Sequence, residues 1–181
     1  EVLDTLPAIA DGGTEAPAAS QKGAVRFENV SFHYGASGRP VLENIDLDIR
    51  PGETVAILGS TGAGKTTLCN LIPRFYDPTE GRILVDGRPL PDYPLDELRQ
   101  KISFVLQKSE LFSGTIADNI RWGNPDATDE QVKAAARVAQ ADEFITGFTE
   151  GYDTIIGEKG ASLSGGQKQR LSIARAVLRQ P

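Results

Sequence analysis

The spacing of apolar side chains predicts a strand-rich beginning and a helix-rich end. In the segment "AVRFENVSFHY", Val25 and Phe27 fall on one face of a predicted strand. In "ENIDLDI", residues 43–49, apolar and acidic side chains alternate. This alternation is typical of antiparallel strands that expose one face to water. We therefore expect these two strands to be neighbours in one β layer.

The next patterns predict alternating strands and helices. The apolar run "TVAILG", residues 54–59, is typical of a fully buried strand, and it leads through glycines into a helix that ends near Pro73. Residues 81–87 and 103–107 are also predicted strands, and "LDELRQKI", residues 95–102, is a predicted short helix between them. The pattern as a whole indicates an α/β fold.

From about residue 112 the periodicity becomes helical. Thr128 and Gln131 have the spacing of a capping box at a helix start. The apolar side chains that follow on one helix face are Val132, Ala135, Ala136 and Ala139. A second apolar stripe predicts the last helix and consists of Leu171, Ala174, Val177 and Leu178. We expect a helical subdomain over about residues 112–163, followed by this last helix.

Composition places these elements in one globular domain behind a linker. Residues 6–23 are rich in alanine, glycine and proline without a hydrophobic period, so residues 1–22 are a predicted linker and residues 23–181 a predicted domain. The net charge of −6 disfavours nucleic acid as a partner, and a single cysteine excludes an internal disulfide. The absence of methionine indicates a piece of a longer protein.

The segment "GSTGAGKTT" carries the strongest chemical signal. It matches the pattern G-x-x-x-x-G-K-[ST] and lies between a predicted strand and a predicted helix. Its glycines let successive backbone N–H groups face a phosphate chain, Lys65 would reach the β and γ phosphates, and the Thr66 hydroxyl would bind Mg²⁺. The predicted phosphate-binding residues are Gly59, Ser60, Thr61, Gly62, Ala63, Gly64, Lys65, Thr66 and Thr67. The alternative is a glycine-rich connection that binds nothing.

A second candidate phosphate site opens the last helix, in "LSGGQKQR". Ser164 and Gln167 can form a capping box, and Gly165 and Gly166 between them lack side chains that would block an anion. The alternative is a flexible helix cap without a ligand. The presence of the phosphate loop favours the phosphate site.

Together, "GSTGAGKTT" and "LSGGQKQR" resemble the nucleotide-binding domain of ATP-binding cassette (ABC) transporters, over residues 23–181. The resemblance implies a P-loop NTPase core with an antiparallel β layer and a helical subdomain, incomplete at the C-terminus. It implies ATP and Mg²⁺ as ligands and a second ABC domain, identical or not, as partner. In that family, the phosphate loop of one subunit and the signature helix of another enclose ATP in a head-to-tail dimer.

The resemblance also assigns roles to three further residues. Tyr34 would stack on adenine, and Gln107 would be a catalytic residue that contacts Mg²⁺ or the attacking water and links to the transmembrane domain. Glu158 would contact the transmembrane domain. The alternatives are an aromatic residue packed at a strand end, a polar strand end and an exposed loop carboxylate.

The segments "LFSGTIADNI" and "EVLDTLPAI" are similar to those of exporters with fused membrane domains. The expected function is therefore an ATPase domain that powers export at the cytoplasmic face of the cell inner membrane. The alternatives are a non-hydrolysing regulatory half of an asymmetric transporter and a soluble ABC ATPase. A GTPase is disfavoured because no N-K-x-D stretch is present.

The chain departs from the family pattern at its end. Family members continue into a strand with an Mg²⁺-binding aspartate, a catalytic glutamate and a switch histidine, which this sequence lacks. We therefore expect this chain to bind nucleotide without turning it over. We also expect an exposed apolar edge beside residues 54–58, where the missing strand would lie.

Overall fold

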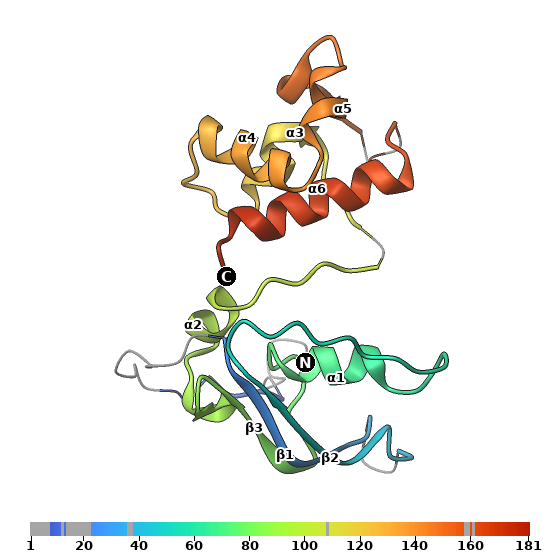
Figure 1. The fold of residues 1–181 in the computed structure, drawn as a ribbon, viewed down its shortest axis with the longest axis vertical. Coiled ribbons are helices and arrows are strands. Elements are labelled where there is room, and N and C mark those ends of the chain that lie inside the picture. The colour runs from blue at the N-terminus through green and yellow to red at the C-terminus, as the bar shows by residue number, and fades with distance from the viewer. Residues whose placement is uncertain are drawn as a thin grey trace, which may run out of the picture. The chain divides into compact units, whose positions relative to one another are not determined.

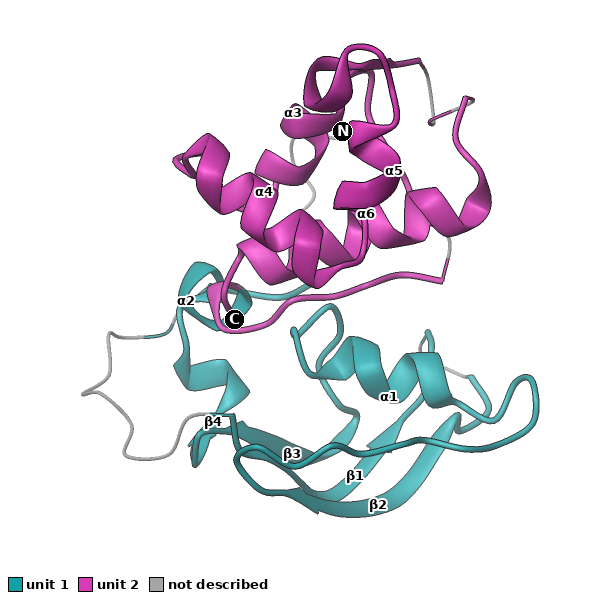
Figure 2. Cartoon of the chain, turned by 45° about the horizontal axis from the view of Figure 1, so that its top comes forward, with its two compact units in different colours: residues 1–99 teal, residues 100–181 magenta. Residues whose placement is uncertain are grey.

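The computed structural model describes residues 8–11, 13, 23–35, 38–107, 109–157, 160 and 162–181. The chain divides into two compact units, residues 1–99 and residues 100–181, which Figure 2 colours separately. Most of the predicted linker, residues 1–22, lies outside the described residues, and the domain bounds remain a prediction. No helix within the described ranges is both long and apolar enough to cross a bilayer.

The first unit is built on a four-stranded antiparallel sheet. Its strands are β1 (Val25–Phe32), β2 (Leu42–Ile49), β3 (Glu80–Val85) and β4 (Arg88–Pro89), in the spatial order β2-β1-β3-β4 (Figure 2; Figure 1 labels the first three). The predicted pairing of the first two strands and the predicted strand over residues 81–87 are confirmed.

A β-bulge sets which side chains of β1 point into the core. Phe27 and Val30 are three residues apart, yet both are buried, because the register shifts between them. Asn29 lies in the shift with a φ of 49°, and its backbone N–H donates to the Asp46 carboxylate at 2.8 Å. The Asn29 N–H therefore stays hydrogen-bonded within the bulge, and the Val30 side chain points into the core.

The helical elements of the first unit are α1 (Lys65–Leu71), the 3₁₀ turn η1 (Leu90–Asp92) and α2 (Leu95–Gln100). Helix α1 lies along one face of the sheet in Figures 1 and 2, and it buries Thr67, Leu68 and Leu71. The helix stops just before Pro73, as predicted.

Two predicted strands are absent from the described part of the chain. Residues 54–58 and 103–107 are not assigned to any strand. Their apolar side chains are exposed, most of all Leu58 at 91% and Leu106 at 53%. An interior strand needs hydrogen-bonded neighbours at its sides and cover on its faces, and among the described residues neither segment belongs to a sheet. Both segments have the composition of buried strands, but within the described residues they stay outside the sheets and keep their apolar side chains exposed.

The second unit is mainly helical. Its elements are β5 (Gly114–Thr115), α3 (Ile116–Arg121), α4 (Asp129–Val138), α5 (Asp142–Thr146), the 3₁₀ turn η2 (Gly151–Asp153), β6 (Ile155–Ile156) and α6 (Gly165–Leu178). Strands β5 and β6 pair antiparallel. One hydrophobic cluster joins the helices and includes the predicted apolar stripes of α4 and α6, with Val177 partly buried against it.

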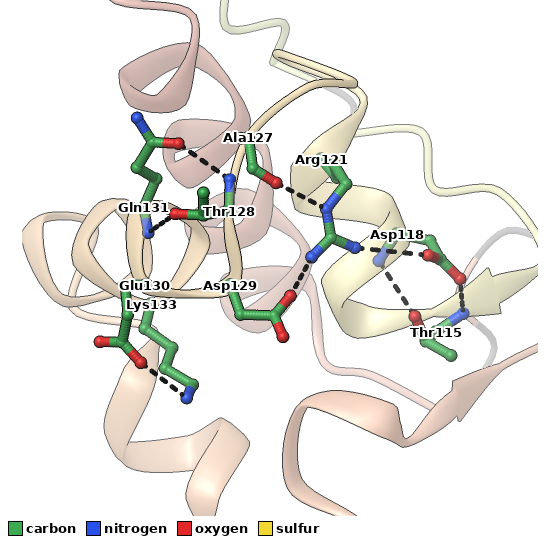
Figure 3. A network of polar contacts seen from close by, with 9 residues as sticks. All are labelled: Thr115, Asp118, Arg121, Ala127, Thr128, Asp129, Glu130, Gln131 and Lys133. Atoms are coloured by element: carbon green, nitrogen blue, oxygen red, sulfur yellow. Dashed lines mark hydrogen bonds and ion pairs between the residues drawn. The ribbon is translucent and has the colours of Figure 1, made fainter.

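The start of α4 has the predicted capping box. Gln131 N–H donates to the Thr128 hydroxyl at 3.3 Å, and Thr128 N–H donates to the Gln131 side-chain oxygen at 2.8 Å. Beside it, Arg121 of α3 donates to the Ala127 carbonyl and pairs with Asp129, so α3 and α4 are tied together at this end (Figure 3).

A buried asparagine joins three segments of the second unit. Asn119 is 1% exposed, and its side-chain amide donates to the carbonyls of Phe112 at 2.8 Å and Thr115 at 3.0 Å. Its side-chain oxygen accepts from the Phe112 N–H at 2.9 Å. Arg175 of α6 donates from Nε to the Asn119 backbone carbonyl at 2.9 Å. Every polar atom of the Asn119 side chain is therefore paired.

Candidate functional site

The predicted phosphate loop curls directly into α1. Gly62 and Gly64 have φ angles of 85° and 83°, in the left-handed region that glycine adopts without strain. The Ala63 N–H donates to the Ser60 carbonyl at 3.2 Å and closes a turn inside the loop. Residues 59–63 are all exposed, so the loop backbone is accessible to a ligand.

Lys65 folds back over this loop. Its ammonium donates to the carbonyls of Gly59 and Ser60, both at 2.7 Å. The loop therefore holds the lysine charge beside its own backbone, and a phosphate oxygen would be a stronger acceptor for it than a neutral carbonyl.

The two left-handed glycines should differ in their tolerance of alanine. A Cβ at Gly64 would lie 2.9 Å from the Val41 carbonyl oxygen, whereas a Cβ at Gly62 would meet nothing within 4 Å. Both substitutions strain the backbone by about 1 kcal/mol, but only Gly64→Ala adds a steric clash. We expect Gly64→Ala to lower the free energy of unfolding by at least about 1 kcal/mol more than Gly62→Ala. Urea unfolding of both variants measures this difference, and equal losses would contradict it.

The two threonines after Lys65 have different surroundings. Thr66 is exposed at the start of α1, so its hydroxyl is available to a metal ion bound with phosphates. Thr67 is buried, at 7% exposure, and its hydroxyl lies 3.0 Å from the Tyr34 hydroxyl. The exposed hydroxyl at Thr66, the lysine and the open loop fit a magnesium nucleotide. The Mg²⁺ would take its other ligands from phosphate oxygens and water.

The structure brings Tyr34 to the first turn of α1, through this contact with Thr67. Its side chain is 44% exposed, and the rings of Phe32 and Tyr76 lie against it. The contacts of Phe32 and Tyr76 with Tyr34 could not be predicted from the sequence, because no local pattern indicates that residues 32–34 meet residue 76.

The second candidate phosphate site has the predicted capping box. Gln167 N–H donates to the Ser164 hydroxyl at 3.3 Å, and Ser164 N–H donates to the Gln167 side-chain oxygen at 2.8 Å. Gly165 and Gly166 are exposed, and a Cβ on either would meet nothing within 4 Å. The first turn of the 14-residue helix α6 is therefore open to solvent.

The structure gives less information about the remaining candidate residues. Gln107 is exposed at the end of the segment 103–107, which belongs to the second unit, whereas the phosphate loop belongs to the first. Glu158 lies outside the described residues. Cys69 on α1 is half-buried, and burial raises the pKa of its thiol, which disfavours the reactive thiolate.

Comparison with known proteins identifies the family. A family model described as ABC transporter matches residues 42–181. The chain is 54% identical over 169 residues to an ATP-dependent lipid A-core flippase of Chromobacterium violaceum, covering 93% of the chain and 29% of that protein. It is also 52% identical over 160 residues to a putative multidrug export ATP-binding/permease protein of Bacillus subtilis. This match covers 88% of the chain and 28% of that protein.

Among solved structures, a bacterial Atm1-family ABC exporter with ATP bound superposes with a TM-score of 0.94 at 41% identity. This match covers 99% of the chain and 31% of the exporter. The chain thus spans less than a third of the length of these relatives. Its fold is that of the P-loop NTPase core of ABC proteins, with an antiparallel β layer and a helical part, and the chain belongs to the ABC transporter family.

Proposed function

We propose that this chain is the ATP-binding domain of an exporter and encloses ATP in a head-to-tail dimer. The observation that carries the proposal is that one chain presents two exposed, glycine-containing backbone segments at helix starts, each of which we propose as a phosphate site. The first is the loop with Lys65, and the second is the first turn of α6 at Gly165 and Gly166. In a head-to-tail dimer, the Lys65 loop of one subunit and the first turn of α6 of the other would lie on either side of each ATP, so both segments would be used.

In this proposal, each residue of the loop has a distinct role. The N–H groups of residues 59–64 cradle the phosphate chain, Lys65 binds the β and γ phosphates, and Thr66 holds Mg²⁺. Bound Mg²⁺ neutralises charge on the phosphate oxygens. Tyr34 stacks on adenine, and Ser164, Gly165, Gly166 and Gln167 of the partner domain meet the γ-phosphate.

The names of the relatives support export as the process that ATP drives. A flippase and a putative export permease each share more than half of their aligned residues with this chain. We assign the domain to the cytoplasmic face of a membrane, covalently linked to a transmembrane domain that it contacts near Gln107 and Glu158. The permease name among the relatives argues against a soluble ABC ATPase.

The relatives also indicate that this domain does not select the transported substrate. The lipid A-core flippase and the multidrug export protein have different named cargo, yet their identities to this chain are nearly equal, at 54% and 52%. The proposed role of this domain is therefore to supply energy, and the cargo is set by other parts of the transporter.

Association in the presence of Mg-ATP tests the proposal. We expect light scattering to show a monomer without nucleotide and a dimer with Mg-ATP. Gly166→Val should weaken ATP-driven association at least about tenfold, because its side chain would occupy the position of the partner's phosphate. The matched control is Gly157→Val, at an exposed glycine where a Cβ also meets nothing within 4 Å, and it should dimerise normally.

The same samples test the expectation that the chain alone does not turn ATP over. None of the proposed site residues is a carboxylate that could activate water, so the dimer should persist without phosphate release. Dimerisation without nucleotide, or equal dimerisation of Gly166→Val, would contradict the proposed dimer. Phosphate release that depends on Lys65 would contradict only the expectation that this chain does not turn ATP over.

A further inference from the structure

Two hydroxyl groups join the predicted adenine-binding residue to the helix that follows the phosphate loop. The hydroxyl oxygens of Tyr34 and Thr67 lie 3.0 Å apart, although the residues are 33 positions apart in the sequence. Either hydroxyl can donate. Thr67 is 7% exposed, so its hydroxyl is largely shielded from water and depends on this partner.

Two further aromatic rings pack edge-to-face against the Tyr34 ring. Phe32, buried at the end of β1, lies 4.8 Å from the Tyr34 ring at an interplanar angle of 87°. Tyr76, which follows α1, lies 5.2 Å away at 89°. Phe32 and Tyr76 also contact each other, at 5.6 Å. These perpendicular contacts favour one orientation of the Tyr34 ring.

Tyr34 nevertheless keeps 44% of its surface exposed. A planar base can therefore still stack on it, and the ring does not have to be ordered by the ligand. Fixing a contact surface before binding lowers the entropy that binding costs, so the hydrogen bond to Thr67 should increase affinity for a ligand that carries a base.

We propose that Thr67 is a positioning residue for the nucleotide base, and that it acts through the Tyr34 hydroxyl. This inference rests on the proposed function, because it takes Tyr34 as the surface on which adenine stacks. It adds a link between base recognition and phosphate binding, since Thr67 is on the same helix turn as Lys65.

The link predicts a difference between ligands with and without a base. Tyr34→Phe keeps the ring and removes only the hydroxyl. It should weaken Mg-ATP binding about three- to tenfold, which is the range expected when binding has to order one additional side chain. Binding of Mg-tripolyphosphate, which has the phosphate chain but no base, should stay unchanged.

A double-mutant cycle separates this link from any direct contact between Thr67 and phosphate. In a Thr67→Val background, Tyr34→Phe should have no further effect on Mg-ATP affinity, because the hydroxyl has already lost its partner. In a Thr67→Ser background, which keeps the hydroxyl, the full effect of Tyr34→Phe should return. Isothermal calorimetry of the 181-residue chain gives all the affinities, and melting temperatures show whether each variant is folded.

The outcomes distinguish this inference from the proposed function. An undiminished effect of Tyr34→Phe in the Thr67→Val background, or no effect in the parent chain, would overturn the inference alone. Equal affinity of the parent for Mg-ATP and Mg-tripolyphosphate would also overturn it and leave the phosphate site standing. A parent chain that binds neither ligand would overturn the proposed function as well.

Discussion

Replacing Lys65 with alanine is expected to reduce Mg-ATP affinity at least about 100-fold while the chain stays folded. The substitution removes charge-assisted hydrogen bonds to two phosphates, and each such bond contributes about 1.5–3 kcal/mol. Among the residues that the structure describes, the lysine ammonium bonds to the carbonyls of Gly59 and Ser60. Both residues are exposed, so water can replace the ammonium there. The free energy of unfolding should change by no more than about 1 kcal/mol.

Two control variants make this result specific. Lys133 on α4 is a lysine whose ammonium pairs with Glu130 at 3.2 Å, away from the site residues in sequence, and Lys133→Ala should leave nucleotide affinity unchanged. Lys65→Arg keeps the charge but replaces a compact ammonium by a larger planar group, so it should restore little affinity. Calorimetry with Mg-ATP measures all three variants. If Lys65→Ala bound Mg-ATP within about threefold of the parent, the assignment of the phosphate loop would be wrong.

Replacing Asn119 with alanine is expected to lower the free energy of unfolding by about 2–4 kcal/mol. The substitution leaves the Phe112 N–H and the carbonyls of Phe112 and Thr115 without their partner in a buried place. Helix α3 would then lose three hydrogen bonds to the segment before it. Few single substitutions of a polar residue in this chain should cost more.

The matched control for Asn119 is Asn124, a half-buried asparagine whose side-chain oxygen accepts one bond, from the Asp126 N–H at 3.1 Å. Asn124→Ala should cost no more than about 1 kcal/mol. Urea unfolding followed by circular dichroism compares the two variants. A loss below about 1 kcal/mol for Asn119→Ala would show that water enters and satisfies the freed groups.

Local sequence patterns predicted those parts of the fold that depend on local interactions. The alternation in residues 43–49 and the capping boxes at Thr128 and Ser164 each involve side chains within a few positions of one another. The phosphate-loop motif is also local, because its glycines and lysine are contiguous. Such features need no knowledge of the rest of the chain.

Non-local contacts limited the prediction elsewhere. Residues 54–58 and 103–107 have the composition of buried strands, but a strand forms only where another segment pairs with it, and pairing cannot be read from one segment. The bulge at Asn29 likewise moved Val30 inward, where strict alternation after Phe27 would have placed it outward.

The candidate site shows the same division. The residues proposed to bind phosphate all lie in two short motifs that can be read from the sequence, and Tyr34 was proposed through family resemblance. The hydrogen bond between Tyr34 and Thr67 could not be predicted, because it depends on how the end of β1 meets the first turn of α1. The contact of Tyr76 with Tyr34 could not be predicted either, because it depends on the path of the chain after α1.

The central claim is that the folded chain binds Mg-ATP at the loop of Lys65, and thermal unfolding with and without Mg-ATP tests it most directly. A ligand that binds only the folded state adds about 2.7 kcal/mol of stability at 100 times its dissociation constant. We predict a cooperative transition that moves to higher temperature with Mg-ATP in the parent chain and does not move in Lys65→Ala. A parent chain whose transition stays in place at saturating Mg-ATP, or a shift that persists in Lys65→Ala, would contradict the claim.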